Sequence, residues 1–323
     1  MSELAEFARV VHESKQSSDN RLLEPVEYPA RCRRLGDIRA VIVDVYGTLV
    51  NYWREEFADA DTRETALLGS FGEVADRFGM IPSLRAVNPA DPPEKTLRDF
   101  YHGLISLRQQ RGVKEGIEYS EIKIEEIWGL IVTLLSRHGY DPSRLGGDDS
   151  ATFSRKIAWF YNYKALGRTL YPGVVETLEA LKKKNMVLGI LSNGQFYTPV
   201  DLTLMIRDQS GGRFEDIYEL FDTDLTFFSY EYLVAKPGEL LFRKLFDALY
   251  EFQILPEQTL MVGNDLAIDI AAAQRLRMKT AFFAGDRHCA FMHEQGGKTV
   301  PDLVFTSWTD LIEQLSFHAE EEE

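Results

Sequence analysis

Unbroken runs of apolar residues recur along the chain and alternate with helical patterns. The runs are AVIV at 40–43, MVLGILS at 186–192, TLMVG at 259–263, KTAFFAG at 279–285 and a shorter LVFTS at 303–307. Such runs are typical of parallel strands that are buried on both faces. Helical patterns such as GVVETLEALKKKN and LAIDIAAAQRLRM lie between them. The alternation predicts an α/β fold with a Rossmann-like parallel sheet.

The interval after the first strand has a different pattern. It holds TLRDFYHGLISLRQQRG, KIEEIWGLIVTLLSRHG and ATFSRKIAWFYNYKAL, separated by loops rich in Pro, Gly and Asp. These are long helical patterns without a clear strand, and they predict an α-helical domain inserted into the α/β core. The predicted parts are an N-terminal extension at 1–37, the core at 38–50 and 171–318, a helical cap at 51–170 and an acidic tail at 319–323.

Length and charge narrow the functional classes. A chain of 323 residues is long enough for two domains. The formal net charge of −15 disfavours contact with nucleic acid or anionic membranes, and an anionic substrate would need local cations or a metal. Cys32 and Cys289 give no disulfide framework or zinc pattern. Without a signal peptide or an apolar segment of membrane-spanning length, the expected location is the cytoplasm. The oligomeric state stays open.

Polar residues follow three of the predicted strands. Asp44 follows the first, Ser192 and Asn193 end the second, and Asn264 and Asp265 follow the third. Since parallel strands present their carboxyl ends at one edge of a sheet, we expect these side chains to converge. Taken singly, each could instead cap a helix or form a turn.

Four motifs in order resemble the haloacid dehalogenase superfamily of hydrolases. They are VIVDVYGTL from residue 41, VLGILSNG from 187, VAKPGELLF from 234 and LMVGNDLAIDIAAA from 260. The resemblance covers the α/β core, and it reaches the helical block only through its position as a cap. It implies hydrolysis of a small anionic metabolite.

The chemistry of the motif residues agrees with that resemblance. Asp44 is the candidate nucleophile, because a carboxylate can form a covalent ester or acyl phosphate that is hydrolysed later. The hydroxyls of Thr48 and Ser192 would hold a transferring anionic group, with Asn193 beside them. Lys236 would neutralise the repulsion between nucleophile and substrate. Tyr46 completes the predicted catalytic set.

The last motif suggests a metal. Mg²⁺ prefers oxygen ligands and is usually held by one or two carboxylates and water. The implied ligand set is Asp44, Tyr46, Asp265 and Asp269. A five-residue spacing would put an acid at Asn264, whereas the four-residue spacing between 265 and 269 is met. The alternative is that Asp265 caps the helix and Asp269 is buried against Lys236.

Tyr46 separates two reactions within the superfamily. Phosphatases of the superfamily have a second aspartate at this position as general acid and base, and a phenol is a much poorer base near neutrality. The 2-haloacid dehalogenases have tyrosine in a DxYGT motif, because a halide leaves without protonation. Their other features match less well: Phe242 stands where they have tyrosine, and their SxNxxD motif falls on Asn264, Leu266 and Asp269. Their cap arginine could correspond to Arg54, Arg63 or Arg77.

The preferred hypothesis is an Mg²⁺-dependent hydrolase of a small phosphomonoester. A metal-independent 2-haloacid dehalogenase and a non-catalytic anion-binding protein with the same fold are the alternatives. Aromatic residues of the cap could line its inner side, although their helical spacing favours core packing. These aromatic residues are Tyr52, Trp53, Trp128, Trp159 and Tyr161.

Overall fold

The computed structural model describes residues 2–14, 23–29, 35–292 and 299–320, with side chains up to residue 315. The chain forms two compact units. The helical unit contains Met1–Ser17 and Trp53–Gly167, and the core unit contains Ser18–Tyr52 and Arg168–Glu323. The predicted acidic tail and Cys32 lie wholly or partly outside the described residues.

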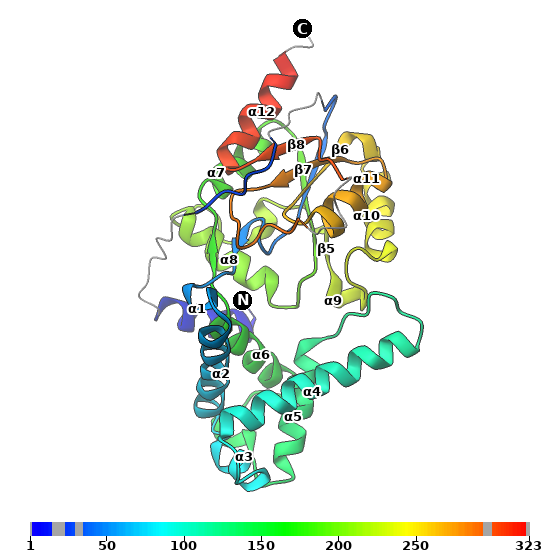
Figure 1. Ribbon diagram of the computed structural model, residues 1–323. Coiled ribbons are helices and arrows are strands. Elements are labelled where there is room, and N and C mark those ends of the chain that lie inside the picture. Colours follow the sequence, from blue (N-terminus) through cyan, green and yellow to red (C-terminus); the bar gives the residue numbers. More distant parts are fainter. Residues whose placement is uncertain (1, 15–22, 30–34, 293–298, 321–323) are drawn as a thin grey trace. The chain divides into compact units, whose positions relative to one another are not determined.

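A six-stranded sheet forms the centre of the core unit (Figure 1). Its order is β5–β4–β1–β6–β7–β8, and all neighbouring strands are parallel. In the central register, Val43 of β1 pairs with Ile190 of β4 and Val262 of β6. This arrangement confirms the predicted α/β fold. The strands are β1 (Ala40–Val43), β4 (Val187–Ser192), β5 (Thr226–Phe228), β6 (Thr259–Gly263), β7 (Lys279–Phe283) and β8 (Leu303–Phe305).

Helices cover both faces of this sheet, which explains why its strands are apolar on both sides. Val41 and Val43 pack in a cluster with residues of α7 (Val174–Lys183), α8 (Thr198–Gln209) and α12 (Trp308–Glu320). Ala40 and Ile42 pack on the opposite face against α10 (Glu239–Glu251) and α11 (Ala272–Arg275). Alternate residues of β1 therefore face different helix layers, as the two-residue period of a strand requires.

The helical unit consists of six α-helices among the described residues. Asp59 and Asp149 begin two of them, because each carboxylate accepts hydrogen bonds from two backbone N–H groups of the first turn. Phe71, Trp128 and Tyr161 pack together in the interior, with ring centroids of Phe71 and Tyr161 4.4 Å apart. The helices are α1 (Glu3–Glu13), α2 (Ala60–Arg77), α3 (Ile81–Val87), α4 (Pro93–Lys114), α5 (Ile124–Ser136) and α6 (Ser150–Ala165).

The first helix belongs to the helical unit, although the sequence analysis assigned residues 1–37 to one separate extension. Leu4, Ala8 and Val11 are buried on one side of α1, and Phe7 packs edge-on against Trp159 of α6 at 5.8 Å. Tyr28, in contrast, packs against Phe282 of the core unit. The described parts of this segment are thus divided between the two units by where their apolar residues are buried.

Short elements complete the fold. Where the chain leaves the core unit and returns to it, β2 (Val50–Asn51) pairs antiparallel with β3 (Thr169–Leu170), a pair that the sequence analysis did not predict. Among the described residues, none of the helices combines the length and apolarity needed to cross a bilayer. The remaining elements are η1 (Glu55–Phe57), η2 (Pro142–Leu145), η3 (Ile217–Glu219), η4 (Thr223–Leu225), α9 (Ser229–Tyr232), η5 (Pro256–Gln258) and η6 (Leu266–Ala271), the last of which is a π-helix.

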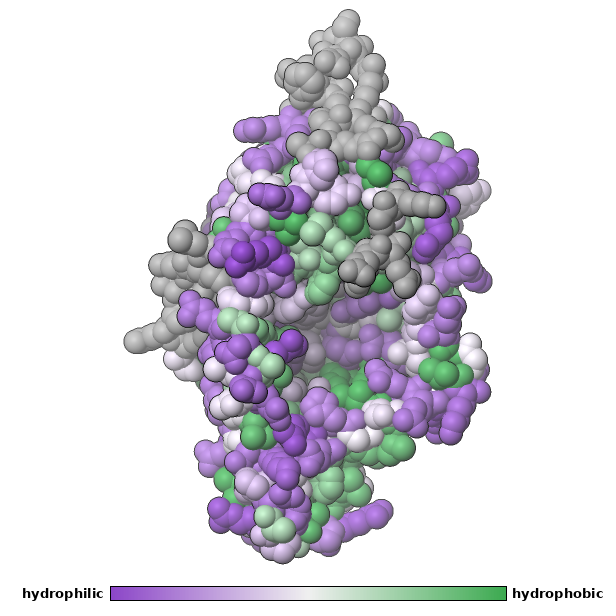
Figure 2. Space-filling model, in the orientation of Figure 1, coloured by the Kyte–Doolittle hydropathy of each residue, from purple (hydrophilic) through white to green (hydrophobic). Residues whose placement is uncertain are grey.

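The surface agrees with the charged composition. Figure 2 shows hydrophilic residues over most of the drawn face, with hydrophobic residues interspersed. Exposed large apolar residues, such as Leu107 and Tyr250, occur on both units. Isolated apolar residues of this kind are normal on a protein surface.

Candidate active site

The carboxyl ends of three adjacent strands carry the polar residues predicted to converge. Asp44 follows β1, Ser192 is the last residue of β4, and Asn264 follows β6. β1 lies between β4 and β6 in the sheet. All three side chains are buried, so these polar groups depend on protein partners rather than on bulk water.

Lys236 joins two carboxylates at this edge. Its Nζ lies 2.6 Å from Asp44 Oδ1 and 2.7 Å from Asp269 Oδ1. Burial lowers the pKa of Lys236, but the negative charges of Asp269 and Asp44 outweigh that effect and leave the pKa raised. The ammonium group therefore stays charged and holds Asp44 in place by a charge-assisted hydrogen bond.

Asn193 fixes the backbone that carries this lysine. Its Oδ1 accepts a hydrogen bond from the Lys236 N–H at 2.6 Å, and its Nδ2 donates to the Lys236 carbonyl at 3.3 Å. The amide thus satisfies both backbone groups of one residue in the loop before α10. Asn193 positions Lys236 through the backbone, whereas the sequence analysis placed it only beside the reacting group.

The carboxylates of Asp269 and Asp265 both accept backbone hydrogen bonds at the start of η6. Asp269 Oδ2 accepts the backbone N–H of Asp265 at 3.1 Å, while its Oδ1 accepts Lys236 Nζ. Asp265 Oδ1 accepts the N–H groups of Ala267 and Ile268 as a helix cap. Burial raises the pKa of Asp269 to about 7, an effect that Lys236 opposes and that the Asp44 charge increases.

These contacts bear on the predicted metal-ligand set. Both oxygens of Asp269 accept hydrogen bonds, as in the alternative arrangement that the sequence analysis kept open, and each carboxylate oxygen keeps a second lone pair. Within the described ranges, no group of three or more His, Cys, Asp or Glu side chains could hold a metal ion. Asp44 and Asp265 still supply the one or two carboxylates that Mg²⁺ requires.

The turn after Asp44 is held by an amide rather than by a further acid. Thr48 Oγ1 donates to Asn264 Oδ1 at 2.9 Å and lies 3.4 Å from Asp44 Oδ2. Asn264 Nδ2 donates to the Cys289 carbonyl at 2.5 Å. Gly47 adopts a φ of 86°, and a Cβ there would overlap the Asn264 side chain. Asn264, a mismatch to the phosphatase motif, thus packs against the glycine turn and bonds its threonine.

Ser192 has the one site hydroxyl without a hydrogen-bond partner in the part of the chain that the structure describes. Its Oγ is buried and lies at the end of β4, next to β1. A buried hydroxyl without a partner costs free energy unless a ligand supplies one. Ser192 is therefore suited to donate a hydrogen bond to a bound anion.

Tyr46 lies beside a second polar group. Its hydroxyl is 3.1 Å from Thr198 Oγ1 at the start of α8, a contact across 152 residues of sequence. Burial raises the pKa of Tyr46, although the charge of Arg168 and the Thr198 hydrogen bond work against that rise. The phenol is therefore neutral near pH 7 and can donate a hydrogen bond, but it is a poor general base.

A buried ion pair near Tyr46 was missed by the sequence analysis. Arg168 Nη1 bonds Asp201 Oδ2, both side chains are buried, and the Arg168 guanidinium lies 5.8 Å from the Tyr197 ring centroid. Arg168 begins the segment that returns to the core unit, and Asp201 lies in the first turn of α8. Nothing in the local pattern around either residue distinguishes it from a surface charge, so the sequence offered no signal for this pair.

Several other residues that the sequence analysis named are buried and pack in the interior of their units. Trp128, Trp159 and Tyr161 are buried inside the helical unit. Phe242, at the position where dehalogenases have tyrosine, is buried in a core cluster on one face of the sheet, and Leu266 is buried in another.

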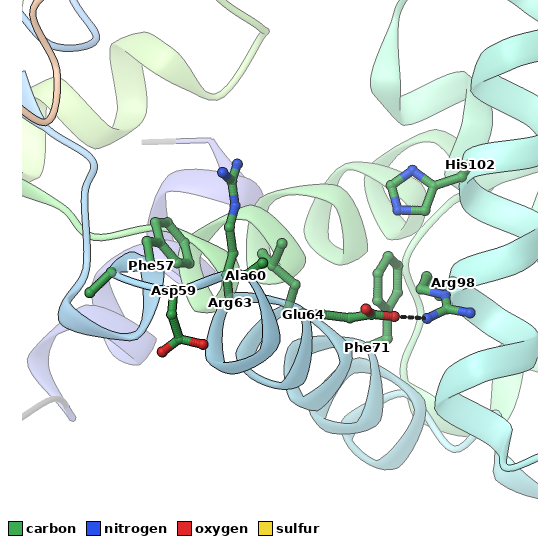
Figure 3. A pocket seen from close by; sticks show the side chains of 10 residues that line it. Phe57, Asp59, Ala60, Arg63, Glu64, Phe71, Arg98 and His102 are labelled. Carbon is green, nitrogen blue, oxygen red and sulfur yellow. Dashed lines mark hydrogen bonds and ion pairs between the residues drawn. The ribbon is translucent and has the colours of Figure 1, made fainter.

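The three candidate cap arginines have different surroundings. Arg54 donates to the Lys164 carbonyl at 2.6 Å, and Arg77 lies over the rings of Phe7 and Phe160. Arg63 lines a hollow of about 580 Å³ in the helical unit. Figure 3 shows it beside Phe57, while Arg98 and Glu64 form an ion pair in the same hollow. Of the three, only Arg63 lies on this hollow.

Comparison with known proteins identifies the family. The fold and the site define an α/β protein with a buried carboxylate–lysine cluster at the carboxyl edge of its sheet. The model of the haloacid dehalogenase-like hydrolases matches residues 38–277. The chain belongs to this family and is a hydrolase, as the four motifs predicted.

Individual relatives are more distant. The glyceraldehyde 3-phosphate phosphatase of Pyrococcus furiosus is 29% identical over 156 residues, which cover 48% of this chain and 58% of that protein. An uncharacterized hydrolase of Schizosaccharomyces pombe is 25% identical over 38% of this chain and 51% of its own length. The chain thus spans little more than half the length of these curated relatives. A 2-haloacid dehalogenase from Pseudomonas syringae pv. Tomato DC3000 is similar in fold, with a TM-score of 0.54, 18% identity, and coverage of 86% of this chain and 98% of that one.

Proposed function

We propose that this hydrolase removes the phosphoryl group from a small phosphomonoester, with Asp44 as the nucleophile. The observation that carries the proposal is the contact of Lys236 Nζ with Asp44 Oδ1 at 2.6 Å. The same Nζ also contacts Asp269 Oδ1. A carboxylate held by a buried cation is oriented for attack. The similarity to a protein named as a glyceraldehyde 3-phosphate phosphatase favours phosphorus as the atom attacked.

The proposed reaction has two displacements. An oxygen of Asp44 forms a bond to phosphorus, and the bond from phosphorus to the alcohol oxygen breaks, which leaves an acyl phosphate. Water then attacks this intermediate, releases inorganic phosphate and restores the carboxylate. Lys236 offsets the repulsion between nucleophile and substrate, and the Ser192 and Thr48 hydroxyls donate to phosphoryl oxygens.

Tyr46 would give up the proton that the departing alcohol needs. Burial raises the pKa of Tyr46, so the phenol is a weak acid that gives up its proton slowly, and the phenolate would then take a proton from the attacking water. We therefore expect slow turnover compared with a site that has a carboxylate at this position.

Asp44 and Asp265 would hold Mg²⁺, together with Tyr46, in this proposal. Bound there, the ion would neutralise charge on the phosphoryl oxygens. Asp269 is the remaining ligand of the proposed set, and its oxygens also accept hydrogen bonds from Lys236 Nζ and the Asp265 N–H.

One specific observation favours dehalogenation of a short 2-halo acid as the second candidate. Tyr46 is a neutral phenol bonded to Thr198, where a phosphatase needs an acid and base. In that reaction Asp44 would attack the carbon bearing the halogen, and the halide would leave with the bonding electrons. Hydrolysis of the resulting ester would restore Asp44, and no proton would pass to the leaving group.

A direct assay tests the proposal. Purified protein is given a panel of phosphomonoesters that includes glyceraldehyde 3-phosphate, and separately 2-chloropropionate, each with and without EDTA. We expect phosphate release that EDTA abolishes, loss of at least about a thousandfold in Asp44→Asn, and unchanged turnover in the exposed control Asp247→Asn. Halide release that is unaffected by EDTA would contradict the phosphatase proposal and would identify the protein as a dehalogenase. If neither product forms and Asp44→Asn still binds phosphate, a non-catalytic anion-binding role replaces both.

A further inference from the structure

A second hollow lies in the core unit, apart from the residues of the candidate active site. It has a volume of about 400 Å³, within the range of sites for small organic ligands. Its walls come from the start of α8, from η3 and η4, from the edge strand β5 and from α9. None of the residues assigned above to chemistry lines it.

Aromatic rings make up much of the wall. Tyr218, Tyr230 and Tyr232 line the hollow with Phe227, whose ring centroid lies 6.2 Å from that of Tyr232. Tyr218 is 42% exposed, so part of its ring is open to solvent and available to a ligand. Aromatic faces attract cations through their quadrupole, and tyrosines also keep a hydroxyl for hydrogen bonding.

Two carboxylates lie on the same hollow. Asp224 and Glu231 line it, and within the described residues neither forms an ion pair. Glu231 Oε1 accepts a hydrogen bond from the Tyr230 hydroxyl at 3.3 Å, and its charge adds to burial in raising the pKa of both Tyr218 and Tyr232. Of the residues that the structure describes, no lysine, arginine or histidine lines the hollow. Among these lining residues its negative charge has no counter-ion.

We propose that this hollow binds an organic ammonium ion. A compact metal ion would require several oxygen ligands, and no cluster of three acidic, histidine or cysteine side chains suited to a metal occurs in the described ranges. An alkylated ammonium combines a positive charge for Asp224 and Glu231 with an apolar surface for the tyrosine rings. The chain's net charge of −15 also favours the approach of cations.

Two residues that line the hollow are adjacent, in the sheet or in the sequence, to residues of the candidate active site. Phe228 pairs with Ser192 in the sheet, and Pro199 directly follows Thr198, which bonds Tyr46. The ammonium could therefore come from a free organic cation or from the alcohol part of a substrate. The chemistry recognised by the hollow is the same in both cases.

Choline and tetramethylammonium are suitable probes, titrated into the full chain while tyrosine fluorescence and NMR shifts are followed against sodium chloride at equal ionic strength. We expect saturable binding that Glu231→Gln and Tyr218→Leu each weaken about three- to fivefold. Glu251→Gln and Tyr250→Leu, exposed and outside the hollow, serve as matched controls and should leave binding unchanged. Asp44→Asn should also bind choline normally.

Absence of saturable binding, or equal weakening in the control variants, would overturn the proposal. The conservative Glu231→Gln change keeps the test decisive if Tyr218→Leu does not fold, which thermal unfolding would reveal.

A kinetic comparison distinguishes the two sources, and this arm rests on the proposed phosphatase function. If the ammonium belongs to the substrate, Glu231→Gln raises KM for phosphocholine and leaves KM for methyl phosphate unchanged. If it is a free ligand, choline binds but neither KM changes. Lack of turnover of both esters would count against the phosphatase alone, because choline binding is measured without turnover.

Discussion

Lys236 Nζ lies 2.6 Å from Asp44 Oδ1 and makes a second contact of 2.7 Å with Asp269 Oδ1, so one buried cation serves two carboxylates. All three side chains are buried. Removing the cation would leave two like charges close together without water to screen them. The lysine therefore has both a structural and a chemical role.

Replacing Lys236 by methionine should destabilise the protein strongly. We expect a loss of about 3–5 kcal/mol in the free energy of unfolding, because Asp44 and Asp269 would stay buried without their counter-ion. Urea unfolding measures this change. Lys183→Met, which removes an exposed lysine paired with Glu179, is the matched control and should cost less than about 0.5 kcal/mol.

A double variant separates the charge effect from lost packing. Adding Asp44→Asn to Lys236→Met removes one of the two uncompensated charges, so the double variant should be more stable than the sum of the single changes predicts. Strict additivity would mean that the lysine stabilises the core through its aliphatic chain instead.

Asp269 should control the acidic side of the pH profile. Its pKa is raised to about 7 by burial, with the Asp44 charge contributing in the same direction. Below that pH Asp269 is neutral and no longer holds Lys236 by charge, so kcat/KM should fall as the pH decreases through about 7. Rates measured between pH 5 and 9 would reveal this limb.

The variant Asp269→Asn provides the control for this assignment. It cannot ionise, so it should have a lower kcat/KM above neutrality and no limb near pH 7. Persistence of the same limb in Asp269→Asn would assign the titration to another group.

Much of the fold and part of the site could be predicted because their signals are local. The continuous apolar runs at 40–43 and 187–192 indicated buried parallel strands, and the polar residues after them lie at one sheet edge. β5 was missed, because three residues ending a loop carry too little pattern to distinguish a strand. The β2–β3 pair was missed for the same reason.

The detailed chemistry of the site depended on contacts that spacing does not encode. A separation of four residues fits a metal pair and a capped helix equally well, and spacing alone does not show that Asp269 Oδ2 accepts the backbone N–H of Asp265. Tyr46 and Thr198 meet across 152 residues, and Arg168 meets Asp201 with no local signal. Such pairings follow from tertiary packing.

Gly47→Ala should lower both stability and turnover, although the substitution adds only one methyl group. Its φ of 86° is unfavourable for alanine, and the added Cβ would overlap the Asn264 side chain that bonds Thr48. We expect a loss of about 2 kcal/mol or more in unfolding free energy, together with reduced turnover. Gly36→Ala has a similar φ of 74° with nothing within 4 Å, so it should cost only the backbone strain of about 1 kcal/mol. Equal losses in the two variants would show that the contact with Asn264 is unimportant.

Tyr46→Asp should separate the two candidate reactions most sharply. An aspartate there supplies the acid and base that a departing alcohol and an attacking water require, and general acid–base catalysis contributes about a hundredfold or more. Phosphate release should therefore rise by about tenfold to a hundredfold. Tyr46→Phe is the matched control: it removes the hydrogen bond to Thr198 without introducing a carboxylate, and it should lower phosphate release.

Halide release needs no proton and should fall in Tyr46→Asp, because a second buried carboxylate would repel the nucleophile and an anionic substrate. A variant that loses phosphate release and keeps its halide release would decide for the dehalogenase.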